Sequence, residues 1–374
     1  MFFYSCNIPF KRVEDKYFLK FVETLNKCSF SYKPPCRQTL GGSVLNKVYE
    51  DITREKKKLL QDTDSVLLVD GWKNKPKNRK YLTFSLCNIH TPQTFLSYKD
   101  TSKETEDGES LAVHINDAVK FAKQEFQTNV FAIITDNDSK IKKGARLSES
   151  ADGTNIWQTT CSSHSGNLLI KTIAEEDDSL KYLRDVIHTF RDPKLESLLI
   201  ELGGTKLQNY PDTRFCYFRD SCESVLKNIP YLQKIILTKD VNIPNLVSQL
   251  IFDENFIQSL KNIIIVLNPI CVLINKCQDP KCNVADAVQY WLSIFEKLPT
   301  NKYDEKIRAR IKKALWPVGY AANILHHKYN GILLNDEQKR VGFEFIKENL
   351  DIEGKTQLDY FFENPEEFSY YAEH

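Results

Sequence analysis

Two aspartates each follow a short apolar run and come just before turn-forming residues. Asp70 follows residues 65–69, and Asp136 comes two residues after the run at 130–134. Runs of this length, rich in Val and Ile, predict strands. Ligands of open α/β sheets gather beyond the carboxyl ends of strands. If these two strands are parallel neighbours, the carboxylates face one another across one strand spacing, roughly 5 Å.

Two carboxylates held that close together repel each other, and a divalent cation between them removes the repulsion. Hard oxygen ligands favour Mg²⁺ or Mn²⁺ over zinc. Two such ions can activate a water and stabilise the leaving oxygen of a phosphodiester, which is the chemistry of nucleases and transposases. The alternative is that Asp70 and Asp136 each cap a turn, as Asp-Gly and Asp-Asn pairs do well. The residues alone leave both interpretations open.

Hydrophobic periodicity predicts the elements that must position these side chains. In chain order we expect strands at 65–69, 81–87 and 94–98, a helix at 109–126, a strand at 130–134, a basic helix, a strand at 157–161 and a helix at about 165–174. An antiparallel meander followed by α/β units is the succession of an RNase H-like core. The predicted fold class is therefore α/β, with an RNase H-like core and a large all-helical insertion domain.

The same pass along the chain predicts three parts. Residues 1–62 form a helical N-terminal segment, residues 63–180 the RNase H-like core, and residues 181–374 a mostly helical insertion domain. Weak strand-like character at residues 235–238 does not change the helical prediction for the third part.

Composition limits the classes of protein. The chain has 374 residues, of which 41% are hydrophobic, and its formal net charge is +1, so binding to nucleic acid must rest on local patches. The ten cysteines show no disulfide spacing, which favours a reducing compartment. The longest apolar run, residues 263–274, falls short of the roughly 20 residues that span a bilayer and is interrupted by Asn268-Pro269. With no secretory leader in the sequence, we expect an intracellular protein that does not enter a membrane.

Two basic clusters come directly after the aspartates. They comprise Lys73, Lys75, Lys77, Arg79 and Lys80 after Asp70, and Lys140, Lys142, Lys143 and Arg146 after Asp136. Clustered Lys and Arg neutralise phosphates, which is the main source of sequence-independent affinity for DNA. Solvated loops are also often rich in lysine, so this interpretation stays open.

Four blocks resemble those of hAT (hobo–Activator) superfamily DNA transposases, in the order and at the spacing of that family. Residues 67–72 (LLVDGW) resemble the block of the first aspartate, and residues 133–139 (IITDNDS) the block of the second. Residues 160–168 (TCSSHSGNL) resemble the family's C-x-x-H block, and Thr213-Arg214-Phe215 resembles its T-R-W element.

The resemblance implies a cut-and-paste DNA transposase core acting in the nucleus. Asp70 and Asp136 would be its catalytic Mg²⁺ or Mn²⁺ ligands, and Arg214 would join the DNA-binding residues. Cys161 and His164 would lie beside the site and either hold local structure or line the DNA path, because two ligands at that spacing make a poor zinc site. Phe215 replaces a Trp implicated in handling flipped DNA, so it keeps the aromatic body without the indole donor.

The largest departure from the family is its third carboxylate. The family supplies a Glu from a C-terminal block that also carries dimerisation, and this sequence has neither that block nor an N-terminal zinc finger. Glu104, Glu106 and Glu109 come too early in the chain to replace it. We therefore expect a transposase-derived protein that is catalytically incomplete as given, with self-association possible. A non-catalytic DNA- or protein-interaction module and a truncated gene model are the alternatives.

Overall fold

The computed structural model describes residues 6, 8–29, 35–89, 91, 93–105, 107–148, 156–208, 216–238, 241–298 and 301–364. The chain divides into two compact units, Met1–Leu59 and Leu60–His374. The division into three parts expected from the sequence remains a prediction.

The elements that the structure describes in the first unit are all helices, in agreement with the helical segment predicted for residues 1–62. It contains η1 (Phe10–Glu14), α2 (Lys16–Lys27), α3 (Arg37–Thr39), η2 (Leu40–Val44) and α4 (Leu45–Leu60), whose last residue belongs to the second unit. Asp15 begins α2, because its carboxylate accepts the N–H of Tyr17 at 2.9 Å. None of the described side chains of α2 is buried.

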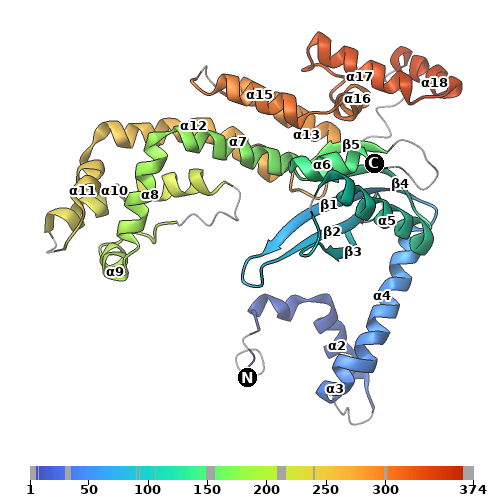
Figure 1. Cartoon of the computed structure of the whole chain (residues 1–374). Helices are drawn as coiled ribbons and strands as arrows, with labels where there is room; N and C mark the ends of the chain where they lie inside the picture. Colours follow the sequence, from blue (N-terminus) through green and yellow to red (C-terminus); the bar gives the residue numbers. More distant parts are fainter. Residues whose placement is uncertain are drawn as a thin grey trace. The chain divides into compact units, whose positions relative to one another are not determined.

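The second unit contains a mixed five-stranded sheet (Figure 1). Its strands are β1 (Asp64–Asn74), β2 (Arg79–Cys87), β3 (Thr94–Asp100), β4 (Asn129–Thr135) and β5 (Trp157–Thr160). They lie in the order β3-β2-β1-β4-β5; β1, β2 and β3 are an antiparallel meander, while β4 and β5 run parallel to β1. The predicted α/β class, the succession of elements, and the parallel neighbours β1 and β4 are confirmed.

The predicted end of the first strand at Asp70 is wrong. β1 continues to Asn74, because residues 70–74 pair with β2 as far as Arg79. The hairpin closes through Asn78, which takes the left-handed conformation with φ 47°. Pairing with β4 on the other side of β1 stops earlier, at Val69↔Thr135.

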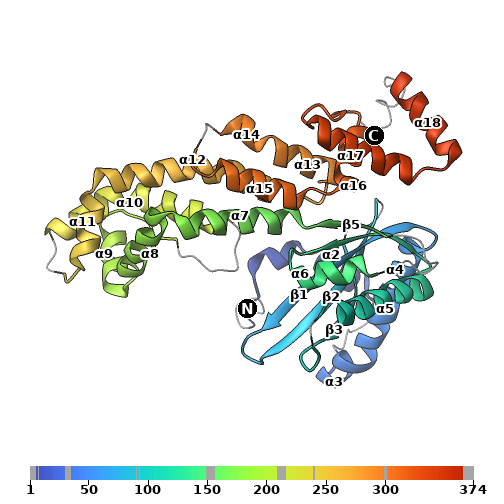
Figure 2. The same cartoon turned by 45° about the horizontal axis from the view of Figure 1, so that its top comes forward.

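Two helices, α5 (Gly108–Phe126) and α6 (Ser139–Arg146), cover one face of the sheet (Figure 2). The core beneath them contains Leu67, Val69, Leu82, Phe84, Leu111, Ile115 and Ile141. The two helices approach closely at Gly144, where an added Cβ would lie 3.1 Å from the backbone nitrogen of Ala112 and 3.2 Å from the carbonyl oxygen of Gly108. This contact fixes α6, and therefore the segment that follows Asp136.

The rest of the described chain is helical, as expected. It comprises α7 (Ser162–Glu176), α8 (Asp178–Phe190), α9 (Pro193–Glu201), α10 (Tyr217–Thr238), α11 (Asn245–Phe252), α12 (Glu254–Lys276), α13 (Val284–Leu292), α14 (Ile294–Lys297), α15 (Asp304–Ala314), α16 (Pro317–Leu325), α17 (Asp336–Glu348) and α18 (Ile352–Glu363). These helices share a hydrophobic core of their own. The fully buried Trp291 lies in it and donates its indole N–H to Ser162 Oγ at 3.3 Å.

The structure contains one helix that is long and apolar enough to span a membrane, although the sequence predicts no such segment. α12 has 23 residues and a window of mean hydropathy 1.8, so by length and composition it could cross a membrane. The interruption expected at Pro269 does not occur, because the proline lies inside the helix. Buried residues of α12 such as Leu260 and Leu267 belong to the helical core. A single such helix is weak evidence, since core helices of soluble proteins pass the same test.

Candidate functional site

The strand register brings Asp70 and Asp136 side by side. The parallel pairing of β1 with β4 ends at Val69↔Thr135, and the two aspartates are the next residue of each strand. Electrostatics agrees with this placement, because the charge of Asp70 contributes to raising the pKa of Asp136. The two carboxylates expected to face one another are therefore neighbours at the point where the parallel pair ends.

Both carboxyl groups are partly desolvated. Burial is the main cause that raises the pKa of Asp70 and of Asp136 above the ordinary value. For Asp136 a hydrogen bond from the N–H of Asp138, at 2.9 Å, acts in the opposite direction. The charge of His164 also lowers the pKa of both carboxyls. Two like-charged, partly buried carboxylates disfavour each other's ionised form, and a bound cation would relieve that repulsion.

Cys161 and His164 lie beside this pair because β5 leads directly into α7. Cys161 precedes the first residue of α7, and its N–H donates to Thr135 O at 2.8 Å, which ties the start of the helix to the end of β4. Burial raises the pKa of the Cys161 thiol, and the charges of the two aspartates raise it further. Asn137 strengthens the junction by donating to Ser165 Oγ at 2.8 Å.

The donor chemistry of the two carboxylates suits a hard divalent cation, but the set is incomplete. Among the described residues, no group of three or more His, Cys, Asp or Glu side chains could hold a metal ion. The early glutamates do not complete it: Glu104 contacts His114, Glu109 contacts Lys143, and Glu106 lies outside the described residues. Asp70 and Asp136 can therefore supply two ligands, and water or a substrate oxygen would have to supply the others.

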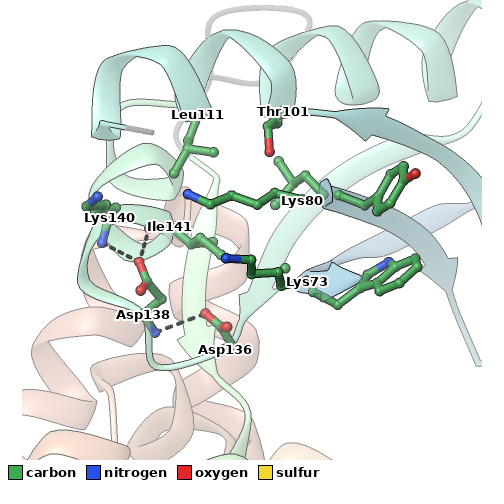
Figure 3. Close-up of a pocket in the computed structure, with 12 residues that line it drawn as sticks. Lys73, Lys80, Thr101, Leu111, Asp136, Asp138, Lys140 and Ile141 are labelled. Carbon is green, nitrogen blue, oxygen red and sulfur yellow. Dashed lines mark hydrogen bonds between the residues drawn. The ribbon is translucent and has the colours of Figure 1, made fainter. Parts of the chain in front are cut away.

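A cavity of about 230 Å³ lies next to Asp136 (Figure 3). Lys73 from β1, Lys80 from β2 and Lys140 from α6 line it. Figure 3 shows the side chains of Lys73 and Lys80 extending from the two strands toward α6. This cavity places ammonium groups beside a carboxylate that could hold a cation, an arrangement that suits a phosphate group bound by both.

The other predicted basic residues lie elsewhere. Lys75 and Lys77 are exposed in the hairpin turn, and Lys142 is half-buried on α6. Three more have partners: Arg79 pairs with Asp100 at 3.2 Å, Lys143 pairs with Glu109, and Arg146 lies 5.3 Å from the centre of the Trp316 ring. Arg214 and Phe215 lie outside the described residues.

Sequence reasoning missed two contributors to this region. Asp138 lines the cavity and begins α6 by accepting the N–H groups of Lys140 at 2.8 Å and Ile141 at 3.2 Å. Its position directly before the predicted basic helix was the available signal. Trp72 also lines the cavity, and its ring stacks on Tyr81 with centroids 4.7 Å apart. The cross-strand register that pairs these two rings has no local signal.

Comparison with known proteins links part of the chain to a described family. No curated protein matches the chain. Residues 35–192 match the model of a family described as a domain of unknown function, DUF659. That span includes Asp70, Asp136, Cys161 and His164, together with the whole sheet. The part of the chain that carries the carboxylate pair thus resembles a domain that is found in hAT-like transposase-related proteins.

Proposed function

We propose that this chain is a transposase-derived nuclear protein of the hAT type. In this proposal the five-stranded sheet is an RNase H-like core that binds DNA and holds Mg²⁺ or Mn²⁺ between Asp70 and Asp136. The described residues do not complete the ligand set for strand cleavage. The observation that carries the proposal is the register of β1 and β4, which makes the two aspartates neighbours.

Strand topology supports the RNase H-like assignment. An antiparallel meander of β1, β2 and β3 adjoins two strands that run parallel to β1, and helices connect the parallel strands. The two aspartates come at the end of the central parallel pair, where open α/β sheets bind their ligands. The DUF659 match over the same residues supports the link to transposase-related proteins.

The cavity beside Asp136 supports DNA as the ligand. Lys73, Lys80 and Lys140 offer ammonium groups there, and backbone phosphates are the groups that such side chains bind without reading sequence. Asp70 and Asp136 would hold the cation, which when bound would polarise a phosphodiester oxygen. Lys73, Lys80 and Lys140 would orient the phosphate, and Asp138 would keep α6 in place through its cap.

A non-catalytic interaction module is the second candidate. It is favoured by the absence, among the described residues, of any group of three potential metal ligands. The two candidates differ in whether the carboxylates bind a cation at all.

Calorimetric titration of the full chain with Mn²⁺ tests the proposal. We expect the unmodified protein to bind with a dissociation constant of about 1 mM or tighter, as weak carboxylate sites do. The Asp70→Asn, Asp136→Asn double variant should lose this binding, because an amide is a neutral and much weaker ligand. Circular dichroism of both proteins checks that the fold is intact.

An Asp117→Asn, Asp185→Asn variant is the matched control, because both of these aspartates are exposed on helices away from the sheet end. It removes the same charge and should bind Mn²⁺ as the unmodified protein does. If all three proteins give the same heats, the carboxylates do not form a metal site, and the interaction module replaces the proposal.

A further inference from the structure

A second basic cavity lies in the helical part of the chain. Its volume is about 240 Å³, and it is bordered by α12, α13, α14 and the segment after α16. Three lysines contribute to its wall, Lys276, Lys297 and Lys328, together with the rings of Tyr290 and Tyr329. None of these residues belongs to the carboxylate site.

The three ammonium groups have no carboxylate partner among the residues that the structure describes. The Lys276 Nζ lies 4.7 Å from the centre of the Tyr290 ring, and the Lys328 Nζ lies 5.5 Å from the centre of the Tyr329 ring. Other lysines of the helical part do form ion pairs, such as Lys302 with Asp177 at 3.3 Å. The cavity therefore gathers three ammonium groups that form no ion pair with a described side chain.

Asp286 is a carboxylate that contacts a residue of the cavity wall, and both of its oxygens already accept hydrogen bonds. Asp286 accepts the hydroxyl of Tyr329 with one oxygen and the N–H of Asn283 with the other, at 3.1 Å, in the capping box that begins α13. Gln289 adds a neutral donor to the wall. Its side-chain oxygen accepts from Asn323 at 3.4 Å, so its amide N–H groups are the polar part left for a ligand.

The cavity is at the end of α12 that packs against the start of α7. Ser163 Oγ donates to Ile274 O at 3.3 Å, and Gly166 lets α12 approach so closely that an added Cβ would lie 2.6 Å from Ile274 Cγ1. Residues Leu273 and Lys276 on this turn of α12 line the cavity. Since α7 begins at the Cys161 junction beside Asp70 and Asp136, the second cavity and the carboxylates lie toward the same end of α7.

We propose that Lys276, Lys297 and Lys328 form a phosphate-binding site, and that its ligand is a backbone phosphate of DNA that also contacts the carboxylate site. Lysine is a common phosphate ligand, acting as a point charge, and the Gln289 amide supplies a neutral hydrogen bond. The phosphate chemistry follows from the cavity alone. The choice of DNA as its source rests on the proposed function.

The competing explanation is that these lysines stabilise helix ends. Lys276 and Lys297 lie in the last turns of α12 and α14, where a cation interacts favourably with the helix dipole. That role predicts a change in thermal stability and no change in ligand binding, so the experiment measures both.

The test compares the full-length protein with a Lys276→Gln, Lys297→Gln, Lys328→Gln variant. Calorimetry with sodium phosphate measures the site itself, and fluorescence anisotropy with a labelled DNA duplex over a range of NaCl concentrations measures DNA binding. The matched control is Lys261→Gln, Lys313→Gln, Lys347→Gln, which removes three exposed lysines from α12, α15 and α17 outside the cavity. Thermal unfolding of all three proteins checks the fold.

We expect the cavity variant, and not the control, to lose phosphate binding. It should also bind DNA about tenfold more weakly near 0.1 M salt, with a salt-dependence slope smaller by about 0.9, the value for one phosphate contact. Loss of phosphate binding with unchanged DNA binding would identify free phosphate as the source and overturn the DNA assignment. Equal phosphate binding by all three proteins, with only a shift in thermal stability, would overturn the site and leave the helix-end role.

The two proposals fail separately. If the unmodified protein binds no DNA, the proposed function loses its ligand, whereas the phosphate titration still decides whether the cavity is an anion site.

Discussion

Asp177 is a buried carboxylate outside the candidate site, and its partners give it a defined charge. It accepts the N–H of Ser179 at 3.0 Å, the hydroxyls of Ser179 and Tyr303, and an ion pair from Lys302. Burial alone would raise its pKa, but these donors together hold the pKa of Asp177 below the ordinary value. The ionised carboxylate therefore joins the end of α7 to the start of α15.

We expect Asp177→Asn to lower the free energy of unfolding by about 1–3 kcal/mol at pH 7, the usual range for hydrogen bonds to a charged group. Because the folded-state pKa is lowered, this stabilisation is present above the ordinary value of 3.8 and is lost as the pH falls through the folded-state pKa. Urea denaturation at pH 7 and near pH 3 measures the difference at both ends. A difference that does not shrink in acid would contradict the role of the charge, and the exposed Asp185→Asn serves as control.

At the scale of residues, the sequence could identify Asp70 and Asp136 because each follows an apolar run and each belongs to a recognisable block. It could not identify which lysines line a cavity with them. Lys73 and Lys75 are alike in the sequence, yet only Lys73 lines the cavity beside Asp136. That difference depends on strand register and on where α6 lies, which are tertiary properties.

At the scale of elements, the order of strands and helices in the second unit was predictable because helices such as α5 bury one stripe and strands such as β1 and β2 bury one face. The end of β1 was not. The apolar run ends at Val69, where pairing with β4 also ends, whereas pairing with β2 continues through largely exposed residues to Asn74. Hydrophobic patterns report burial, so a ribbon with exposed side chains is invisible to them.

Gly144 gives a test of how α5 and α6 are held together. An added Cβ at this position would come within 3.0 Å of Leu111 Cβ and 3.1 Å of the Ala112 backbone nitrogen, and the backbone cannot move aside as a flexible side chain can. We expect Gly144→Ala to lower the free energy of unfolding by about 1–3 kcal/mol, as overpacking in a core does. Chemical denaturation measures it.

The matched control is Gly42→Ala, because nothing lies within 4 Å of the position that its Cβ would take. It should leave stability unchanged or raise it by up to about 1 kcal/mol, since alanine favours helices more than glycine does. Equal effects of the two substitutions would mean that helix propensity decides the outcome and that the α5–α6 contact is not tight.

At the scale of the whole molecule, the second unit contains two hydrophobic cores, one beneath the sheet and one among the helices. Overall composition could not reveal how charge is distributed around them. The 51 Lys and Arg residues nearly balance the 50 Asp and Glu residues, yet both basic cavities contain three lysines. Hydropathy likewise does not distinguish whether α12 is a core helix or a membrane span, because both kinds of helix can have the same length and apolar composition.

The hairpin that extends beyond the parallel pair has a further consequence for association between molecules. From Asp70 to Asn74, β1 pairs with β2 on one side, and no described strand pairs with it on the other. Such an open backbone edge is a template for aggregation, and natural proteins protect it with lysines. Lys73, Lys75 and Lys77 are exposed on this ribbon and its turn, so we expect them to hinder intermolecular strand pairing.

Replacing all three lysines by glutamine should therefore promote concentration-dependent oligomers, which sedimentation velocity would detect. The Lys261→Gln, Lys313→Gln, Lys347→Gln control should sediment like the unmodified protein. If the variant without Lys73, Lys75 and Lys77 also does so, these lysines are not needed to prevent strand pairing between molecules. A substitution made to weaken DNA binding would then alter solubility as well, because the same positive charges would serve both to attract phosphate and to keep neighbouring molecules apart.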